Sequence, residues 1–400
     1  MDRRRLLTFA AALVVAALAA CSPGGAPEAA TTEQPAQPTT ATATPTPSPE
    51  PLRTVSIVAT GDVLLHERVR TQAQEDAATT DVGDMDFEPM LEPIRPVVEA
   101  ADLAVCHLEV PLAPEGGPYR GYPLFSGPPQ VLDGLVATGY DACTTASNHT
   151  FDAGADGVDR TLDALDAAGL AHAGSARSPE EAAEPRLVDV ETQHGVVTVG
   201  LLSFTYGFNG IPYPNGEEWR GNVIAEERIL ADAAATRAAG AEVVVVAMHW
   251  GAEYVHEPNA EQVDLAPRLI ASPDVDLVLG HHAHVVQPVE QLDGEWVVYG
   301  LGNLVAAHRT PGEARSEGLL VRVELTEQPD GTFAATAASY APLLVTDAFP
   351  VRVLDVGQAL VAGDHGTAGE QRLRTAWERT TKVVESGGGA AAGLRPITTP

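Results

Sequence analysis

The chain has 400 residues, of which 24 are basic and 55 are acidic, and its formal net charge is −31 at neutral pH. This acidity argues against nucleic acid as a partner and against a broad basic face that would hold an anionic polymer. Any anionic substrate therefore needs a local positive centre, and bound metal ions would provide one.

The N-terminal segment reads MDRRRLLTFAAALVVAALAAC, in which three arginines precede a short apolar stretch. This pattern predicts a secretory signal peptide over residues 1–20, because the apolar core is too short to span a membrane comfortably. Leu-Ala-Ala-Cys resembles the lipobox of bacterial lipoproteins, which implies lipidation of Cys21. We therefore expect a lipid-anchored protein on the extracytoplasmic face of the cell membrane, with a plain signal peptide cleaved elsewhere as the alternative.

Two further segments have compositions that do not favour a packed core. Residues 21–52 comprise the cysteine that we expect to be lipidated and a stretch rich in Pro, Thr and Ala, which predicts a semi-extended linker. Residues 386–400, SGGGAAAGLRPITTP, predict a disordered tail. The folded domain is therefore predicted over residues 53–385.

Five apolar runs in this domain each stop at polar residues. They are VSIVATGD (55–62), DLAVCHLE (102–109), ACTTASNH (142–149), EVVVVAMH (242–249) and DLVLGHHAH (276–284). The runs are continuous and not alternating, which is typical of strands buried on both faces.

Helical patterns separate the strands. VDRTLDALDAAG (158–169) and AEERILADAAATRAAG (225–240) each end at a glycine, a common helix terminator. Alternating strands and helices predict an α/β layered domain. Near the C-terminus, GLLVRVELTE (318–327) and TFAATAASYAPLLV (332–345) predict an antiparallel pair that closes the second sheet, followed by a helix over 370–385.

The polar strand ends predict a binding site, because ligands of α/β sheets bind beyond the carboxyl ends of the strands. Asp, Glu, Asn and several His side chains suit Zn, Mn, Fe or Co ions. Two such ions could activate a water and stabilise the charge that develops in a transition state. A lone histidine after a strand is commonly an ordinary polar residue, so the prediction depends on five equivalent strand ends.

Six motifs in a fixed order carry a family resemblance. They are GDVLL, HLEVPL, SNHTFDAG, HWGAEY, GHHAHVVQPVE and YGLGNLV, and they extend over about residues 54–310. The order resembles the CapA family of capsule-synthesis proteins, named for poly-γ-glutamate biosynthesis, within the calcineurin-like metallophosphoesterase superfamily. The resemblance implies a four-layer α-β-β-α sandwich of the metallophosphoesterase type with a dinuclear site at one edge of its sheets.

The resemblance also implies roles for single residues. The implied ligands of two divalent metal ions are Asp62, a bridging Glu109, Asn148, His249, His282 and His284. His149 resembles the general acid that protonates the leaving group, and Asp152 resembles the residue that orients it. His281 stays an alternative to His282, because the superfamily motif is a shorter Gly-His-x-His.

Some positions depart from the family pattern. His107 stands where relatives commonly have asparagine, and His66 stands where they are usually small or apolar. Each of these two histidines could be an additional metal ligand. We expect instead that each faces solvent or contacts the metal ligands without binding a metal itself. Glu109 replaces the usual bridging aspartate, so the resemblance alone does not assign phosphoesterase activity.

Two other features allow two interpretations each. Cys106 and Cys143 lie in apolar runs, which predicts buried thiols, with a disulfide as the alternative. The segment 205–219, TYGFNGIPYPNGEEW, is either a substrate loop or an ordinary surface loop.

The functional prediction is an extracytoplasmic, lipid-anchored protein of capsule or poly-γ-glutamate synthesis or release. We expect a dinuclear metal-dependent hydrolase that acts on a phosphoester or an amide. The expected partners are an anionic surface polymer or its precursor, a polymer synthesis or export complex, and the membrane through the lipid anchor. The alternative is a non-catalytic, polymer-binding accessory subunit of an export complex.

Overall fold

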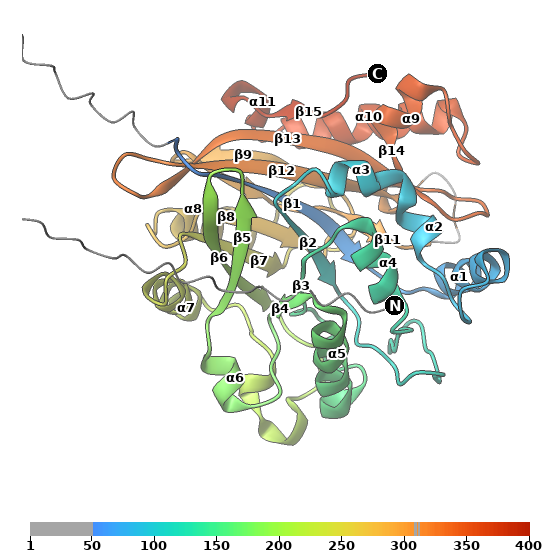
Figure 1. The fold of residues 1–400 in the computed structure, drawn as a ribbon, viewed down its shortest axis with the longest axis horizontal. Helices are drawn as coiled ribbons and strands as arrows, with labels where there is room; N and C mark the ends of the chain where they lie inside the picture. Colours follow the sequence, from blue (N-terminus) through green and yellow to red (C-terminus); the bar gives the residue numbers. More distant parts are fainter. Residues whose placement is uncertain (1–50, 308–309, 311–312) are drawn as a thin grey trace, which may run out of the picture. The chain divides into compact units, whose positions relative to one another are not determined.

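Two β-sheets packed face to face form the centre of the computed structural model, which describes residues 51–307, 310 and 313–400 (Figure 1). The predicted signal peptide, Cys21 and the linker up to residue 50 lie outside the described residues. Within the described ranges, no helix combines the length and the apolar character needed to cross a membrane.

The larger sheet has nine strands, seven of them in the order β14-β13-β12-β1-β2-β3-β4, while β11 pairs with β1 and β15 with β13. Its strands are β1 (Thr54–Val63), β2 (Leu103–Leu108), β3 (Ala142–Thr144), β4 (Ala171–Ala173), β11 (Asn303–Val305), β12 (Glu317–Glu327), β13 (Phe333–Val345), β14 (Val353–Asp355) and β15 (Arg395–Pro396). β1 to β4 run parallel to one another, so their carboxyl ends lie at the same edge.

The smaller sheet has six strands in the order β5-β6-β7-β8-β10-β9. They are β5 (Arg186–Thr192), β6 (Gly195–Thr205), β7 (Val243–His249), β8 (Leu277–His281), β9 (Val289–Leu292) and β10 (Glu295–Val298). β6, β7 and β8 are parallel, and His249 at the end of β7 is in register with His281 at the end of β8.

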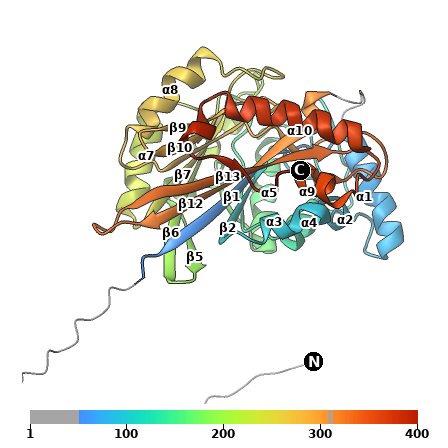
Figure 2. The same cartoon turned by 90° about the horizontal axis from the view of Figure 1, so that it is seen from above.

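Helices cover the outer faces of both sheets, and one further helix contributes Val384 to the core between the sheets. The helices are α1 (Glu67–Thr80), α2 (Glu88–Leu91), α3 (Arg95–Val98), α4 (Val131–Thr138), α5 (Gly154–Ala168), α6 (Pro179–Ala183), α7 (Glu226–Ala238), α8 (Ala260–Ile270), α9 (Val356–Ala362), α10 (Glu370–Glu385) and α11 (Gly389–Ala392). Figure 2 shows α7 and α8 on one side of the strands and α3 and α4 on the other. The α5 helix ends as predicted at Gly169, whose φ of 78° suits a residue without Cβ.

The positions of the apolar cores confirm the four-layer sandwich. Val55 and Ile57 of β1 point between the sheets, whereas Val58 points to the core under α1 to α5. In the smaller sheet, Val244 and Val246 of β7 pack on the other side against α7 and α8. Since both faces of these strands are buried, the apolar runs are continuous, as predicted.

Two C-terminal elements differ from the prediction. The β12–β13 pair joins the larger sheet beside β1 and does not close the smaller one, because the apolar face of β12 fills the core between the sheets next to Val55 and Ile57. The segment 386–400 was predicted to be disordered, but it forms α11 and β15. Leu394 is 1% exposed in the core between the sheets, which explains the order of this segment.

Cys106 of β2 and Cys143 of β3 form a disulfide, so the prediction of free buried thiols is wrong and its alternative is confirmed. The two residues are direct neighbours in the register of parallel strands, a relation that sequence spacing does not show. The disulfide joins two strands that lead into the polar edge of the sheet.

Candidate metal centre

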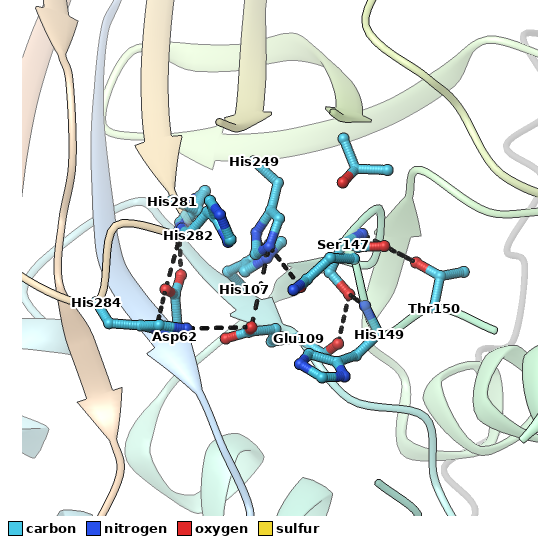
Figure 3. Close-up of polar contacts among 12 residues, drawn as sticks. Asp62, His107, Glu109, Ser147, His149, Thr150, His249, His281, His282 and His284 are labelled. Carbon is cyan, nitrogen blue, oxygen red and sulfur yellow. Dashed lines mark hydrogen bonds and ion pairs between the residues drawn. The ribbon is translucent and has the colours of Figure 1, made fainter. Parts of the chain in front are cut away.

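The polar strand ends of both sheets meet at one edge of the sandwich, as Figure 3 shows. All six predicted metal ligands are buried there: Asp62, Glu109, Asn148, His249, His282 and His284. Asp62 and Glu109 come from the ends of β1 and β2 in the larger sheet. The histidines come from β7 and from the loop that follows β8 in the smaller sheet, so the two sheets complete the site together.

Asp62 is the point where the two sheets come into contact at the site. Its Oδ1 lies 3.0 Å from Nδ1 of His281, and its Oδ2 accepts a hydrogen bond from the backbone N–H of His282 and lies 3.2 Å from Nδ1 of His284. Burial alone would raise the pKa of Asp62, but the contacts with His281 and His284 outweigh burial and hold this pKa well below its usual range. Asp62 is therefore an anion in the centre of the histidine cluster.

Glu109 is a buried carboxylate without the partners that such a group needs. It is 1% exposed, and neither of its oxygens has a hydrogen-bond partner among the described residues. Nε2 of His284 and Nε2 of His249 lie 3.6 and 3.9 Å from Oε1, beyond hydrogen-bonding distance. Burial raises the pKa of Glu109 to about 8.

Asn148 and His249 form a second group of donors beside Glu109. Oδ1 of Asn148 lies 2.9 Å from Nε2 of His249, and the other ring nitrogen of His249 lies 3.0 Å from Nε2 of His107. His107 is in turn 2.8 Å from Oγ1 of Thr144 on β3. The ring of His249 is therefore held from behind, with its Nε2 directed toward Asn148 and Glu109.

His107 is fully buried and does not face solvent. Its ring stacks on that of His281 at 4.1 Å between centroids. Burial and the nearby His281 hold the pKa of His107 well below its usual range, so it is a neutral imidazole. Of the outcomes that the sequence left open, burial excludes only the one in which His107 faces solvent.

The loop GHHAH brings three histidines to the site in different ways. His281 ends β8 and contacts Asp62, while His282 and His284 have positive φ values of 83° and 54° that turn the chain back over the centre. The His282 ring lies 4.8 Å from that of His249, and its Nδ1 has no hydrogen-bond partner among the described residues. His282 thus keeps a ring nitrogen available, whereas one of the nitrogens of His281 is engaged by Asp62.

His284 connects the two carboxylates. Its Nδ1 lies near Asp62 and also 3.0 Å from Oδ1 of Asn303, and its Nε2 faces Glu109. Burial lowers the pKa of His284, but Glu109 and Asp62 together outweigh this effect and raise that pKa to about 9. A cation at this position would take over the role of the imidazolium proton between the carboxylates.

His149 and Asp152 form a pair beside Glu109. Nδ1 of His149 lies 2.7 Å from Oδ2 of Asp152, which also accepts a hydrogen bond from the backbone N–H of Phe125. Burial lowers the pKa of His149, but the hydrogen bond with Asp152 and the charge of Glu109 outweigh it, so this pKa is raised. The pair has the geometry predicted from the SNHTFDAG motif: an oriented imidazole with its other nitrogen directed away from Asp152.

The donor set fits metal ions. Three groups have ligand atoms within 4.8 Å of one another, namely Asp62 with His107 and His281, Glu253 with His282 and His284, and Asp62 with Glu109 and His284. The third group contains the unpartnered oxygens of Glu109, and buried anionic oxygens without protein donors are costly unless a cation meets them. Carboxylate and imidazole donors are those that divalent ions such as Zn, Mn, Fe or Co take.

Comparison with known proteins agrees with this arrangement. The family model described as bacterial capsule synthesis protein PGA_cap matches residues 56–308. The chain belongs to this family. The predicted CapA resemblance is therefore confirmed, and all six predicted ligands lie within the matched residues.

Several members of the capsule-synthesis group are similar to this chain. The PGA biosynthesis protein CapA of Bacillus subtilis is 29% identical over 54% of this chain and 53% of its own length. A probable polyglutamine synthesis accessory protein of Mycobacterium tuberculosis is 26% identical over 58% of this chain and 63% of its own. The capsule biosynthesis protein CapA of Bacillus anthracis is 28% identical over 44% of this chain and 42% of its own length. The chain thus spans about half the length of these relatives.

Solved structures show a more distant likeness. A putative 5′-nucleotidase of Staphylococcus aureus has a TM-score of 0.45 at 15% identity, and the aligned region covers 82% of this chain and 58% of the nucleotidase chain. The calcineurin-like phosphoesterase YfkN of Bacillus subtilis has a TM-score of 0.41 at 15% identity, and the aligned region covers 83% of this chain and 98% of the YfkN chain. Likeness of this degree says nothing about the activity of the PGA_cap chain.

Two site residues lie in the 205–219 segment, which the sequence left with two interpretations. Oδ1 of Asn209 accepts hydrogen bonds from Nδ2 of Asn148 and from the hydroxyl of Tyr206. The contact turns the carbonyl oxygen of Asn148 toward His249. The ring of Tyr206, 42% exposed, lies 4.6 Å from that of His282. The Gly, Asn and aromatic composition indicated a functional loop, but nothing in it pointed to Asn209.

Ser147 is a further residue that the prediction passed over. Its hydroxyl donates to the backbone carbonyl of Glu109 at 2.5 Å and accepts from the backbone N–H of His149. It thus couples the strand end that carries the buried carboxylate to the residue that carries the imidazole. Its position directly before Asn148-His149 was the only signal available in the sequence.

Proposed function

We propose that this PGA_cap protein is a dinuclear metal-dependent hydrolase of the cell envelope that acts on a phosphoester or amide linkage of a capsule polymer or its precursor. The observation that carries the proposal is Glu109, which lies among five other ligand-type side chains and whose buried oxygens have no hydrogen-bond partner among the described residues. A binding protein for a neutral solute would not need a buried carboxylate of this kind.

The residues divide into two sets around Glu109. Asp62 and His284 would hold one ion together with Glu109, and Asn148, His249 and His282 would hold the other. His281 would then hold Asp62 in place, and His107 would fix the ring of His249. Divalent ions bound there would supply an activated water and offset negative charge at the reacting centre.

His149 is suited to give a proton to the leaving group. Asp152 holds one nitrogen of the ring at 2.7 Å, so the other nitrogen is oriented for proton transfer. The raised pKa of His149, in which the hydrogen bond with Asp152 outweighs burial, increases its protonated fraction near neutral pH. The backbone N–H of Phe125 also binds Asp152 and holds this carboxylate toward the imidazole.

The test uses the full-length chain, its bound metal measured by mass spectrometry, and phosphomonoester, phosphodiester and γ-glutamyl substrates. We expect turnover of at least one class, and we expect His149→Ala to retain metal but to lose turnover by about 100-fold or more. His249→Ala should lose metal. A metal-loaded protein that is inert on all three substrate classes would contradict the proposal.

A non-catalytic accessory role is the second candidate, and it is supported by the printed name of the mycobacterial relative, an accessory protein of polyglutamine synthesis. In that case the same edge would bind polymer without cleaving it. Complementation of a deletion strain separates the two functions. Full complementation by His149→Ala would favour the accessory role, and failure by a stable, metal-loaded variant would favour catalysis.

We further propose that the protein is anchored by lipid at Cys21 on the extracytoplasmic face of the membrane, after removal of residues 1–20. The support is the arginine-led apolar stretch that ends in Leu-Ala-Ala-Cys. Cys21→Ala should abolish incorporation of labelled fatty acid and shift the protein from the membrane fraction. Unchanged labelling would contradict the anchor.

A further inference from the structure

A cavity of about 410 Å³ opens beside the metal centre, where β1 leads into α1. His66, Arg68 and Arg70 line it from the beginning of α1, and Gly121 and Tyr122 line it from the opposite loop. Figure 1 shows α1 beyond the end of β1, the strand that carries Asp62. The cavity is therefore part of the same edge of the sandwich as the proposed reaction site.

The Phe125 ring connects the cavity to His149. It makes an edge contact with the His66 ring at 5.7 Å and a second edge contact with the His149 ring at 4.8 Å. The same residue binds Asp152 through its backbone N–H. A single aromatic side chain thus separates the cavity from the pair that is proposed to protonate the leaving group.

The cavity gathers positive charge in a strongly acidic protein. Arg70 has no carboxylate partner among the described residues, and its Nε is buried without a hydrogen-bond acceptor. Other arginines, such as Arg53, Arg177 and Arg352, each contact at least one carboxylate. The Arg70 guanidinium therefore places beside the site a positive charge that no carboxylate among the described residues neutralises.

Arg68 occupies the same lining in a fixed position. Its Nη2 donates to the backbone carbonyl of Asp347, and its guanidinium lies over the Phe349 ring. Glu67 also lines the cavity, but it is exposed to solvent, where its charge is screened. The balance of charge in the cavity is positive, in contrast to the formal net charge of −31 for the chain.

We infer that this cavity is a subsite for an anionic group on the leaving-group side of the substrate, with Arg70 as its principal ligand. The inference rests on the proposed function, because His149 defines the leaving-group side. A guanidinium binds carboxylate and phosphate oxygens through paired hydrogen bonds, and a nearby imidazole and phenol add further contacts. The subsite would select a chain with one negative charge next to the scissile linkage.

The ligand is a carboxylate or phosphate that repeats along a polymer. A γ-linked glutamate chain presents one free carboxylate per residue, and a phosphodiester polymer presents one phosphate per repeat. Both meet the same chemistry in the cavity, so the probes must distinguish them. They are a short γ-linked glutamate oligomer, the same oligomer with its carboxylates amidated, and a glycerol phosphate oligomer of equal length.

The experiment measures binding of each probe by calorimetry to metal-loaded, full-length protein in a His149→Ala background, where probes are not consumed. Arg70→Gln should weaken binding of one charged oligomer about tenfold or more, the effect of losing a charged hydrogen bond. Binding of the amidated oligomer should not change. Arg70→Lys keeps the positive charge but lacks the planar guanidinium that forms paired hydrogen bonds. It should therefore weaken binding of the charged oligomer less than Arg70→Gln does.

Arg374→Gln is the matched control, because it removes the same charge from an exposed position on α10. It should change binding less than twofold. Tyr122→Glu is a second variant at a side chain that is 80% exposed, which the fold should tolerate, and its added charge should weaken the same oligomer. Unfolding temperature and metal content are checked for every variant.

The outcomes separate this inference from the proposed function. If Arg70→Gln weakens binding of a charged oligomer but not of the amidated oligomer, the subsite is supported even if the wild-type protein cleaves no substrate. If Arg70→Gln and Arg374→Gln bind alike, or if wild-type protein binds charged and amidated oligomers equally or binds none of the probes, the subsite is refuted. Hydrolysis of a small phosphodiester by wild type and Arg70→Gln alike would leave the proposed function standing in that case.

Discussion

The two ends of the central strands hold carboxylates in opposite states. Before β1, Arg53 forms hydrogen bonds to both oxygens of Glu242 and to both oxygens of Glu327, and so it ties the smaller sheet to the larger one. At the carboxyl ends, Glu109 is more deeply buried, and neither of its oxygens has a hydrogen-bond partner among the described residues. Both ends join the two sheets, but only at the Arg53 end are the carboxylates paired with a guanidinium.

This contrast separates a structural charge cluster from a ligand site. A buried charge left without partners costs several kcal/mol, so the fold keeps one only where another component balances it. At the Arg53 end the balance comes from the chain itself. At the Glu109 end it comes from a proton or from a bound cation, which is why metal ions fit that end and not the other.

The largest expected effect comes from removing the charge of Glu109. Metal at 100 to 1,000 times its dissociation constant should stabilise the wild-type fold by about 2.7–4.1 kcal/mol. Glu109→Gln keeps the shape of the side chain but should lose most of this gain in thermal unfolding with and without metal. Glu242→Gln, the control at the other end, should keep the full response. Equal responses of the two variants would remove the distinction.

The pH dependence of the metal-free protein sharpens the same contrast. The folded-state pKa of Glu109, raised by burial to about 8, exceeds that of an unfolded glutamate, so the folded state binds more protons between these values. Wild-type stability should therefore fall relative to Glu109→Gln as pH rises from about 5 to 9, by about 3 kcal/mol, the cost of an unsatisfied buried charge.

Urea unfolding of both metal-free proteins across this pH range measures the difference. Glu242→Gln again serves as the control, because Glu242 has partners at every pH in the range. A constant gap between wild type and Glu109→Gln would mean that Glu109 finds a partner in solution.

His107 tests whether support behind a ligand matters as much as the ligand. His107→Phe keeps an aromatic ring against His281 but removes the nitrogen that faces His249. Loss of such a supporting contact should weaken metal binding about 10–100-fold, measured by competition with a chelator. An unchanged affinity would show that His249 is held by packing alone.

The sequence predicted that the candidate ligands lie together, because each follows a continuous apolar run. Parallel strands buried on both faces place their carboxyl ends at one edge, so Asp62, Glu109 and His249 had to be close together. The same reasoning could not show that His107 lies behind His249. That contact joins strands of different sheets, and its register depends on how the sheets stack.

Other errors have the same origin. The pattern of β12 predicted a strand but did not reveal that β1 would be its neighbour, because apolar alternation fits either sheet. The composition of residues 386–400 predicted disorder, yet one buried side chain, Leu394, and pairing of β15 with β13 order the segment. Asn209 is separated from Asn148 by 61 positions, and only the folded loop brings them together.

The smallest effect is expected at the Arg53 end, where the carboxylates are paired with a guanidinium. Arg53→Ala removes a guanidinium shared by Glu242 and Glu327, so the unfolding temperature should fall by about 2–4 °C, since these groups are only partly buried and solvent screens the rest. Metal affinity should not change, because the cluster lies at the opposite end of β1 from Asp62. Arg374→Gln, which breaks an exposed pair on α10, should have no measurable effect on unfolding. If Arg53→Ala weakened metal binding, the two ends would be coupled through the stacking of the sheets, and the separation between structural and ligand carboxylates would no longer hold.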